Sequence, residues 1–507
     1  MNRHAYTTAR QHCTVRPAIA ACLMFMLLAL TSLSSAQNRV DTSPPQGVTL
    51  SLYDVGLGLV NEARRVTLGP GENTMIIRDL PVQADPASLS FSTVTPAAPF
   101  ELLAQRFQYD LGSTRDLLRR MTGQSITMAG NDEAMREGVL MGGPIEGESG
   151  PVLPVRSSEG NAWRMLGMDD ISSLTFPYEE ELFATEPRAL WTVRARREGP
   201  QNFRLTYRVD GLSWRAFYEL VLTGERMEAA LDSRMEIVNH SGGSFENARV
   251  RLLTTERGQS DPIVNREGYL PENRPAMRFA YGAGQPSFER TVAALAPSET
   301  YELPRTVDLP RDATVYIPYL QADTTPVRRF YVYDGVRFDR FQRNIRTDWN
   351  YGTEYHTQVE LHLEFTNEEK FGLGKDLPPG WCRVYERRAD GIVDLIGEEP
   401  LLAIPAGGTG TVRVGPAIGL RGERERTRYE EIRPHHVYEE SFQIRLSNDT
   451  EERTEIRVVE HLYRWSEFEI TRTDTEFSLL SPSTIGFRVE LEPGARKDVN
   501  YTVRYSW

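Results

Sequence analysis

The chain has 507 residues, more than one domain of roughly 100–200 residues can hold. Charged residues make up 25% and hydrophobic residues 40%, a balance typical of folded soluble proteins that excludes a disordered chain. The formal charge of −13 excludes nonspecific binding to nucleic acids, which requires a basic surface. We therefore expect about three or four folded domains and no nucleic acid partner.

Residues 1–36 have the features of an export signal. An apolar run over residues 18–30 is followed by small residues that end at Ala36, and it is preceded by Arg3, Arg10 and Arg16. The run is shorter than the about 20 residues of a membrane-spanning helix, so we expect cleavage and no stable membrane span afterwards. We predict a mature chain of net charge −16, because three arginines are lost from −13. We expect export to the periplasm or cell surface of a bacterium; the alternatives to cleavage are an uncleaved anchor and lipidation at Cys22.

Cleavage leaves a single cysteine in the mature chain. Cys13 and Cys22 belong to the signal and only Cys382 remains, so no internal disulfide can form. A reactive cysteine needs a low pKa and partial exposure, whereas Cys382 lies in a strand-like run. The pattern favours a buried structural thiol in a fold held together by core packing.

After a polar linker at residues 37–47, period-two alternation and turn residues dominate the chain. One recurring sequence motif consists of an apolar strand, a turn that contains proline and a second strand. It occurs at residues 66–77, 307–317, 402–414 and 489–501. These hairpins predict an all-β protein of several β-sandwich, Ig-like units with little helix.

A second phrase places asparagine at the end of an alternating segment, at Asn239, Asn367 and Asn448. Asparagine tolerates left-handed backbone and hydrogen-bonds within its own turn. We interpret each asparagine as the end of a strand and not as a ligand-binding residue.

Residues 106–185 have a different pattern. Helical spacing at residues 114–121 is followed by short strands between glycine-rich turns, at 125–128, 139–141, 151–155, 163–166 and 171–176. This predicts a small SH3-like or Sm-like barrel insertion. The other domains are then an N-terminal β-domain completed by later strands, a central sandwich and a C-terminal sandwich, at 48–105, 186–335 and 336–507.

The sequence contains no GxSxG, HExxH, CxxC, P-loop or GxGxxG motif, and we expect no cofactor. The best candidate for a metal site is the segment 430–440, where carboxylates flank two histidines. Its candidate ligands are Glu430, His435, His436 and Glu439. Because Pro434 marks a loop and adjacent side chains of an extended chain point apart, we prefer to interpret the segment as a polar connector.

Short motifs are spread over most of the mature chain. They include residues 53–60, 68–72, 211–215, 239–242 and 501–507, and the most specific is Gly-Leu-Gly-Lys-Asp-Leu-Pro-Pro-Gly at 372–380. Together these segments resemble the DUF4139 domain family, sometimes described as mucoidy inhibitor-like. The resemblance implies an all-β fold and is compatible with export, but it brings no settled activity and no catalytic residues.

The segment 372–380 is longer than the about 2–5 residues of a simple hairpin loop. Its glycines permit positive φ and its prolines stiffen the exit. Since loops of this kind often have a function, we name Lys375 and Asp376 as candidate partner-contacting residues. A crossover loop that serves only the fold is the alternative.

We expect a non-enzymatic envelope or periplasmic protein that binds another macromolecule, either an envelope protein or a polysaccharide. The alternative is a secreted hydrolase that uses carboxylates or a divalent metal, which clustering of Glu430, His435, His436 and Glu439 around a pocket would favour. A third interpretation is an outer-membrane β-barrel, suggested by alternating aromatic residues before Trp507. Charged residues on both faces of its strands disfavour it.

Overall fold

The computed structural model describes residues 38–93, 100–111, 113–130, 135–147, 150–157, 162–176, 184–223, 227–255, 297–336 and 347–507. The predicted signal peptide lies outside these residues. The described residues form two compact units. Unit 1 takes residues up to Gln46 with Ala63–Leu80 and Phe91–Leu205, and unit 2 takes Gly47–Glu62, Pro81–Ser90 and Thr206–Trp507.

A four-stranded sheet in unit 1 has the order β1 (Asn38–Asp41), β4 (Glu72–Ile77), β13 (Arg188–Ala195) and β6 (Phe100–Gln108). Strand β1 lies within the segment predicted as a linker and pairs with β4 in parallel. The sheet buries Trp191 completely, and the ring of Phe91 lies 4.5 Å from that of Phe100. Aromatic packing therefore forms this core.

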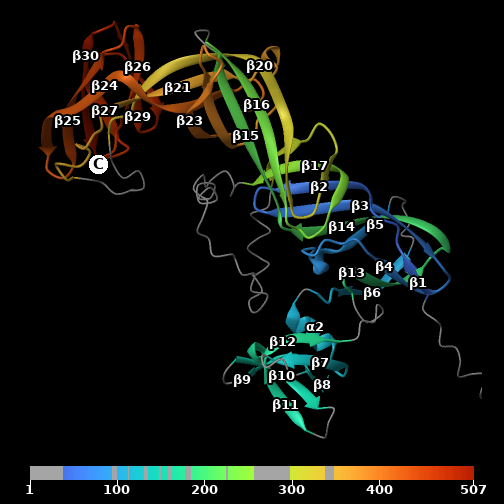
Figure 1. The fold of residues 1–507 in the computed structure, drawn as a ribbon. Coiled ribbons are helices and arrows are strands. Elements are labelled where there is room, and N and C mark those ends of the chain that lie inside the picture. The colour runs from blue at the N-terminus through green and yellow to red at the C-terminus, as the bar shows by residue number, and fades with distance from the viewer. Residues whose placement is uncertain are drawn as a thin grey trace, which may run out of the picture. The chain divides into compact units, whose positions relative to one another are not determined.

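The insertion contains α2 (Thr114–Arg120) and one small sheet (Figure 1). Its order is β11 (Trp163–Gly167), β10 (Gly150–Ser157), β8 (Met135–Leu140), β7 (Ser125–Gly130) and β12 (Ile171–Thr175), with β9 (Ile145–Gly147) on β10. Leu118 and Met121, at the end of the helical segment, pack on Ile126 and Leu140 of the sheet. Within the described residues no pairing of β11 with β12 closes the sheet into a full barrel.

A seven-stranded sheet joins the start of the chain to later strands. Its order is β18 (Pro297–Glu302), β17 (Phe245–Thr255), β2 (Gln46–Tyr53), β3 (Leu57–Leu68), β14 (Gly199–Asp210) and β5 (Ser90–Thr93), with β19 (Val307–Leu309) on β17. Strand β2 pairs in parallel with β17, so its hydrogen-bonding partner comes from a distant part of the sequence.

A thirteen-stranded sheet forms most of unit 2. Its main path is β23 (Val393–Leu401), β22 (Gly380–Arg387), β15 (Leu212–Thr223), β16 (Glu228–Asn239), β20 (Ala313–Tyr333), β21 (Gln358–Thr366), β24 (Thr409–Arg433), β25 (Val437–Asn448), β30 (Arg496–Ser506) and β27 (Phe468–Thr473). The branch is β26 (Thr454–His461), β29 (Thr484–Leu491) and β28 (Phe477–Ser481), and it joins the path at β20.

Two long strands make this sheet continuous. Strand β20 has 21 residues: its first part pairs with β16, and its last residues pair with β21 and β26. Strand β24 has 25 residues and pairs first with β21 and then with β25. The predicted domain boundary between residues 335 and 336 lies just after β20, which is yellow in Figure 1. This strand pairs with β16, which precedes the boundary in the sequence, and with β21 and β26, which follow it.

The prediction of an all-β protein with little helix is confirmed. Among the described residues α2 is the only α-helix, and the 3-10 turns are Pro86–Ser88, Met168–Asp170 and Glu369–Phe371. None of the described helices is long and apolar enough to cross a membrane. Cys382 is fully buried in β22, where burial raises the pKa of its thiol to about 12, which confirms the structural interpretation.

Candidate functional site

The candidate metal ligands lie near the turn between β24 and β25. Glu430 and Glu439 face each other across the two strands, but each is ion-paired with an arginine, Arg428 or Arg504. Over the parts of the chain that the structure describes, no three or more His, Cys, Asp or Glu side chains are grouped so that they could hold a metal ion.

The two histidines of this segment are exposed. The backbone N–H of His435, at φ 59°, donates to Glu431 Oε1 at 2.7 Å. His436 Nδ1 lies 3.1 Å from the carbonyl oxygen of Trp507, and the Trp507 N–H donates to the His436 carbonyl at 3.0 Å. These contacts tie the C-terminus to the turn.

The loop 372–380 is held by contacts within unit 2. Asn367 Nδ2 donates to the Lys375 carbonyl at 2.7 Å, and Asp376 Oδ1 accepts from the Ala406 N–H at 2.9 Å. Gly374 has φ 89°, and a Cβ there would lie 2.8 Å from the Glu369 backbone. The Asp376 carboxylate thus has a structural contact, whereas Lys375 is an exposed residue.

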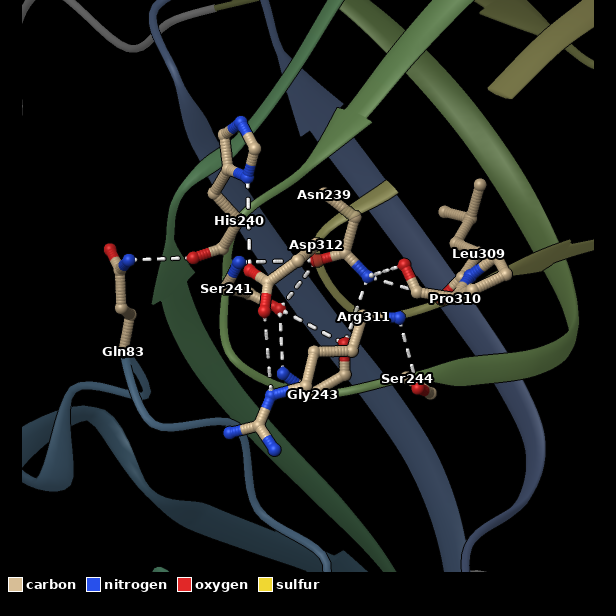
Figure 2. Close-up of polar contacts among 10 residues, drawn as sticks. All are labelled: Gln83, Asn239, His240, Ser241, Gly243, Ser244, Leu309, Pro310, Arg311 and Asp312. Carbon is tan, nitrogen blue, oxygen red and sulfur yellow. Dashed lines mark hydrogen bonds and ion pairs between the residues drawn. The ribbon is translucent and has the colours of Figure 1, made fainter. Parts of the chain in front are cut away.

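The three asparagines at strand ends make the same set of contacts, which we call the Asn clamp. Figure 2 shows Asn239, whose Nδ2 donates to the carbonyls of Leu309 (3.1 Å) and Pro310 (2.9 Å), while its Oδ1 accepts from the Ser241 N–H at 3.1 Å. Asn367 bonds the carbonyls of Ile404 and Pro405 in this way, and Asn448 bonds those of Leu491 and Glu492. Each clamp joins a strand end to the turn of a proline hairpin.

The Asn clamps are therefore structural elements. Asn239, Asn367 and Asn448 are all fully buried, so their amides cannot reach a ligand in solution. Their interpretation as strand ends is confirmed, since β16 and β25 end at Asn239 and Asn448, and β21 ends one residue before Asn367.

A buried charged cluster lies in the C-terminal part of unit 2. It consists of Arg424, Arg426, Arg464, Glu440 and Glu460. Arg424 Nε donates to both Glu460 oxygens, at 3.0 and 2.9 Å, and both side chains are completely buried. Glu440 accepts from Arg426 and from Arg464, each at 2.9 Å.

The cluster contains three arginines and two glutamates, so one positive charge is not balanced by a carboxylate of the cluster. Burial alone would lower the pKa of Arg424, but Glu460 raises that pKa well above its ordinary value, and the guanidinium stays charged. The Arg424 guanidinium also lies 3.9 Å from the ring centroid of Phe442, whose negative face attracts a cation.

Backbone carbonyls of residues 347–356, which we call the strap, accept further hydrogen bonds from the arginines of the cluster. Arg424 Nη1 donates to the Gly352 carbonyl at 2.7 Å, and Arg464 Nη1 donates to the Asp348 carbonyl at 3.1 Å. The Tyr429 hydroxyl donates to the Thr347 carbonyl at 3.0 Å. Hydrogen bonds from charged donors to carbonyls are stronger than neutral ones, so the cluster fixes the path of the strap.

The strap presents an aromatic surface to solvent. Trp349 is 69% exposed, and the Arg426 guanidinium lies 5.5 Å from its ring centroid and 4.9 Å from that of Tyr429. Tyr355, at the other end of the strap, is 43% exposed and lines a pocket of about 90 Å³ with Gln443 and Arg445. We call Trp349, Tyr355, Tyr429 and Arg426 the strap surface.

Chemically, the strap surface can bind, but the cluster beneath it is not arranged for catalysis. Glu440 and Glu460 are both completely buried and ion-paired, so neither carboxylate can donate a proton to a substrate in solution. The exposed indole of Trp349 offers a flat apolar face, while the Arg426 guanidinium beside it is 6% exposed, ion-paired with Glu440, and holds the ring in place.

Sequence reasoning missed this site, although a signal was present. In β26 the core-facing series Ile456, Val458 continues with Glu460, and in β25 the series around Phe442 includes Glu440. A carboxylate at an inward position of an alternating strand predicts a buried ion pair. The positions of the partners and of the strap depend on tertiary contacts that no local pattern reports.

Comparison with known proteins yields a family and no relative. No curated protein sequence matches the chain. The sequence model described as "Domain of unknown function (DUF4139)" matches residues 203–507, which contain the Asn clamps, the loop 372–380 and the strap surface. The chain therefore belongs to the DUF4139 family, a family without an assigned function.

Proposed function

We propose that this chain is an exported, non-enzymatic protein of the bacterial envelope or periplasm that binds another macromolecule through the strap surface. The carrying observation is Trp349, a large aromatic side chain that is 69% exposed on a segment held by buried arginines. An indole that is mostly exposed adds little to the core, so its fixed position favours a role outside the fold.

The cost of the cluster supports this proposal. Burying charges costs several kcal/mol per ion, and a buried ion pair is often no more stabilising than apolar residues of the same size. An apolar core would leave the strap carbonyls without donors, whereas Arg424 and Arg464 hold two of them in place. The cluster therefore serves the position of the strap more than the stability of the core.

The composition of the strap surface also fits a protein partner. Tryptophan, tyrosine and arginine are enriched at the energetically important positions of protein interfaces. Trp349, Tyr429 and Arg426 are held against one another before any partner binds. Such preorganisation lowers the entropic cost of association.

Capture from an envelope extract tests the binding role. The mature chain is immobilised as wild type, as Trp349→Ala and as Trp163→Ala, in which the changed residue is also a tryptophan, 60% exposed and in unit 1. We expect one captured species to be lost with Trp349→Ala and kept with Trp163→Ala. Equal capture by all three proteins would show that the strap surface is not the binding site.

The N-terminus of the protein from an envelope fraction tests export separately. Cleavage after Ala36 gives a mature chain that begins at Gln37. Mass spectrometry of the intact protein is expected to show the loss of residues 1–36. A chain that retains Met1 would refute cleavage and favour an anchored protein.

A further inference from the structure

Strand β11 is an edge of the small sheet in unit 1 (Figure 1), and no other described strand pairs with its outer side. Its five residues pair with β10 in one register, without a bulge. Trp163 and Met165 on this strand are 60% and 56% exposed. A regular, unpaired edge that carries large apolar side chains is a template for pairing with another strand.

The opposite edge of the same sheet is protected against such pairing. The pairing of β12 with β7 contains a bulge between Ile171 and Ser173. The side chains of Ser172 and Ser173 are exposed and polar, and the Ser172 hydroxyl donates back to the Ala129 carbonyl at 3.0 Å. A bulge twists an edge away from further pairing, and β11 has none.

The hydrogen bonds of β10 show where the backbone groups of β11 point. The Pro154 carbonyl accepts from the Met141 N–H at 2.9 Å, so the backbone of Pro154 points away from β11. Met165 is the register partner of Pro154, and in an antiparallel pair of this kind both residues turn their N–H and C=O groups away from each other. The backbone groups of Met165, and those of Trp163 two residues earlier, therefore point to the open edge.

The sequence of β11 suits antiparallel pairing with an identical strand. Around a two-fold axis at Met165, this residue lies opposite its counterpart, and Trp163 lies opposite Gly167 of the second copy. All three positions have the same backbone direction, so the N–H and C=O groups of the two strands match. Because Gly167 has no side chain, the indole of the other copy can lie across it.

The neighbouring registers are less favourable. An axis at Arg164 would set two exposed guanidinium groups directly opposite each other, and like charges in a cross-strand pair destabilise a sheet. An axis at Leu166 would set Trp163 opposite Asp169, which belongs to a 3-10 turn and not to a strand. The axis at Met165 instead sets Arg164 against Leu166, whose side chain can cover the aliphatic stem of the arginine.

We propose that the mature chain forms a two-fold symmetric dimer in which β11 pairs antiparallel with β11 of a second copy around Met165. This pairing joins two six-stranded sheets into one. A contact between two strands of five residues buries less than the about 1,200–2,000 Å² of a stable interface, so the dimer is weak and forms at high protein concentration. The proposed function does not depend on it, since β11 is in unit 1 and the strap surface is in unit 2.

Sedimentation velocity of the mature chain from about 10 to 500 µM tests the dimer, and we expect a monomer–dimer equilibrium within this range. Met165→Lys sets two positive charges opposite each other and should raise the dissociation constant about threefold to tenfold. Met135→Lys is the matched control, because Met135 is 67% exposed on β8, which is not an edge of the sheet. The control should associate as the wild type does.

Met165→Cys tests the register. The Cα atoms of opposite residues that exchange hydrogen bonds are about 5.5 Å apart, within the about 4.4–6.8 Å that a disulfide spans. Cys382 is buried, so the introduced thiol is the exposed one. We expect mild oxidation to link Met165→Cys into a dimer and to link Met135→Cys much less.

Every variant is expected to keep the wild-type thermal midpoint, which separates lost pairing from lost folding. The proposal is overturned if the wild type stays monomeric over the whole range, if Met165→Lys associates like its control, or if the two cysteine variants link equally. A dimer that is lost in Trp349→Ala and kept in Met165→Lys would also overturn it, because self-association would then belong to the strap surface.

Discussion

Glu460 and its partners show how a buried charge can serve a surface position. Both oxygens of the Glu460 carboxylate accept hydrogen bonds from Arg424 Nε. Its Oε2 also accepts a hydrogen bond from the Tyr501 hydroxyl at 2.5 Å. Arg424 in turn reaches the Gly352 carbonyl of the strap. Because each member is completely buried, removal of one leaves the others without compensation.

Substitution of this glutamate tests that dependence. Glu460→Ala is expected to lower the free energy of unfolding by about 3–5 kcal/mol, since it leaves Arg424 as an unpaired buried cation. The control is Glu490→Ala, which removes the exposed pair with Arg453 and should change stability little. Urea denaturation followed by circular dichroism measures both. Equal effects of the two substitutions would contradict a structural role for the cluster.

Cys382 provides a second prediction for a single side chain. Its thiol is fully buried and its pKa is raised from 9.0 to about 12 by burial. The neutral thiol is therefore favoured in the folded state. Its contribution to stability is complete below pH 9 and is lost as the pH rises toward 12, because the unfolded thiol ionises first.

We expect Cys382 of the mature chain to resist a thiol reagent at pH 8 and to react fully in denaturant. Reductant should leave the thermal midpoint unchanged, because the mature chain has no internal disulfide partner for this residue. Rapid labelling of the native protein would mean that β22 opens readily. A large fall in the midpoint on reduction would instead indicate a disulfide-linked dimer.

The Asn clamp links two kinds of sequence repeat that we first identified separately. The proline hairpins and the strand-ending asparagines were each recognisable from local residues, because turn chemistry depends on a few adjacent positions. Their contact was not, since Asn448 and Leu491 are 43 residues apart and meet only in the folded chain. Local patterns thus predicted the parts of the clamp and not its assembly.

Removal of one Asn clamp tests how much the clamp contributes to the free energy of unfolding. Asn448→Ala leaves the carbonyls of Glu452, Leu491 and Glu492 without their donor, and we expect a loss of at least about 2 kcal/mol of unfolding free energy. Asn500→Ala is the control, because Asn500 is exposed and its side-chain amide donates to Asp474. Chemical denaturation of both variants should separate them clearly. Equal losses of unfolding free energy in the two variants would show that the Asn clamp stabilises the fold no more than an exposed side-chain hydrogen bond does.

The loop 372–380 remains a candidate partner-contacting site, and the structure sharpens its test. Asp376 Oδ1 accepts a hydrogen bond from the Ala406 N–H, so Asp376→Ala should lower the stability of the fold as well as any binding. Lys375→Ala leaves that contact intact and probes the surface alone. We expect Lys375→Ala to keep the wild-type midpoint; unchanged partner capture by this variant would exclude Lys375 from the binding surface.

The sequence predicts the strands of the chain where the alternation of apolar and polar residues is regular. It does not predict the sheet that the long strands β20 and β24 form. The predicted helix and five short strands of the insertion match α2, β7, β8, β10, β11 and β12 closely. The continuous sheet was missed, because β20 and β24 are several times longer than the typical strand of about 5–6 residues. In β24, moreover, charged residues occupy both faces, so the sequence pattern does not distinguish the buried Arg424 from its exposed neighbours.

The proposed binding function rests on the strap surface, which lies within the family match over residues 203–507. Its residues come from the strap and from β24, and the cluster that holds them adds β25, β26 and Arg464. A partner that binds there should slow amide exchange in the strap, because bound backbone opens less often.

Hydrogen–deuterium exchange of the mature chain, with and without the species captured from the envelope extract, is therefore the decisive experiment. We predict slower exchange over residues 347–356 when the partner is present, and no such change when Trp349→Ala is used instead. Slower exchange confined to the loop 372–380 or to unit 1, with the strap unchanged, would contradict the proposed binding surface.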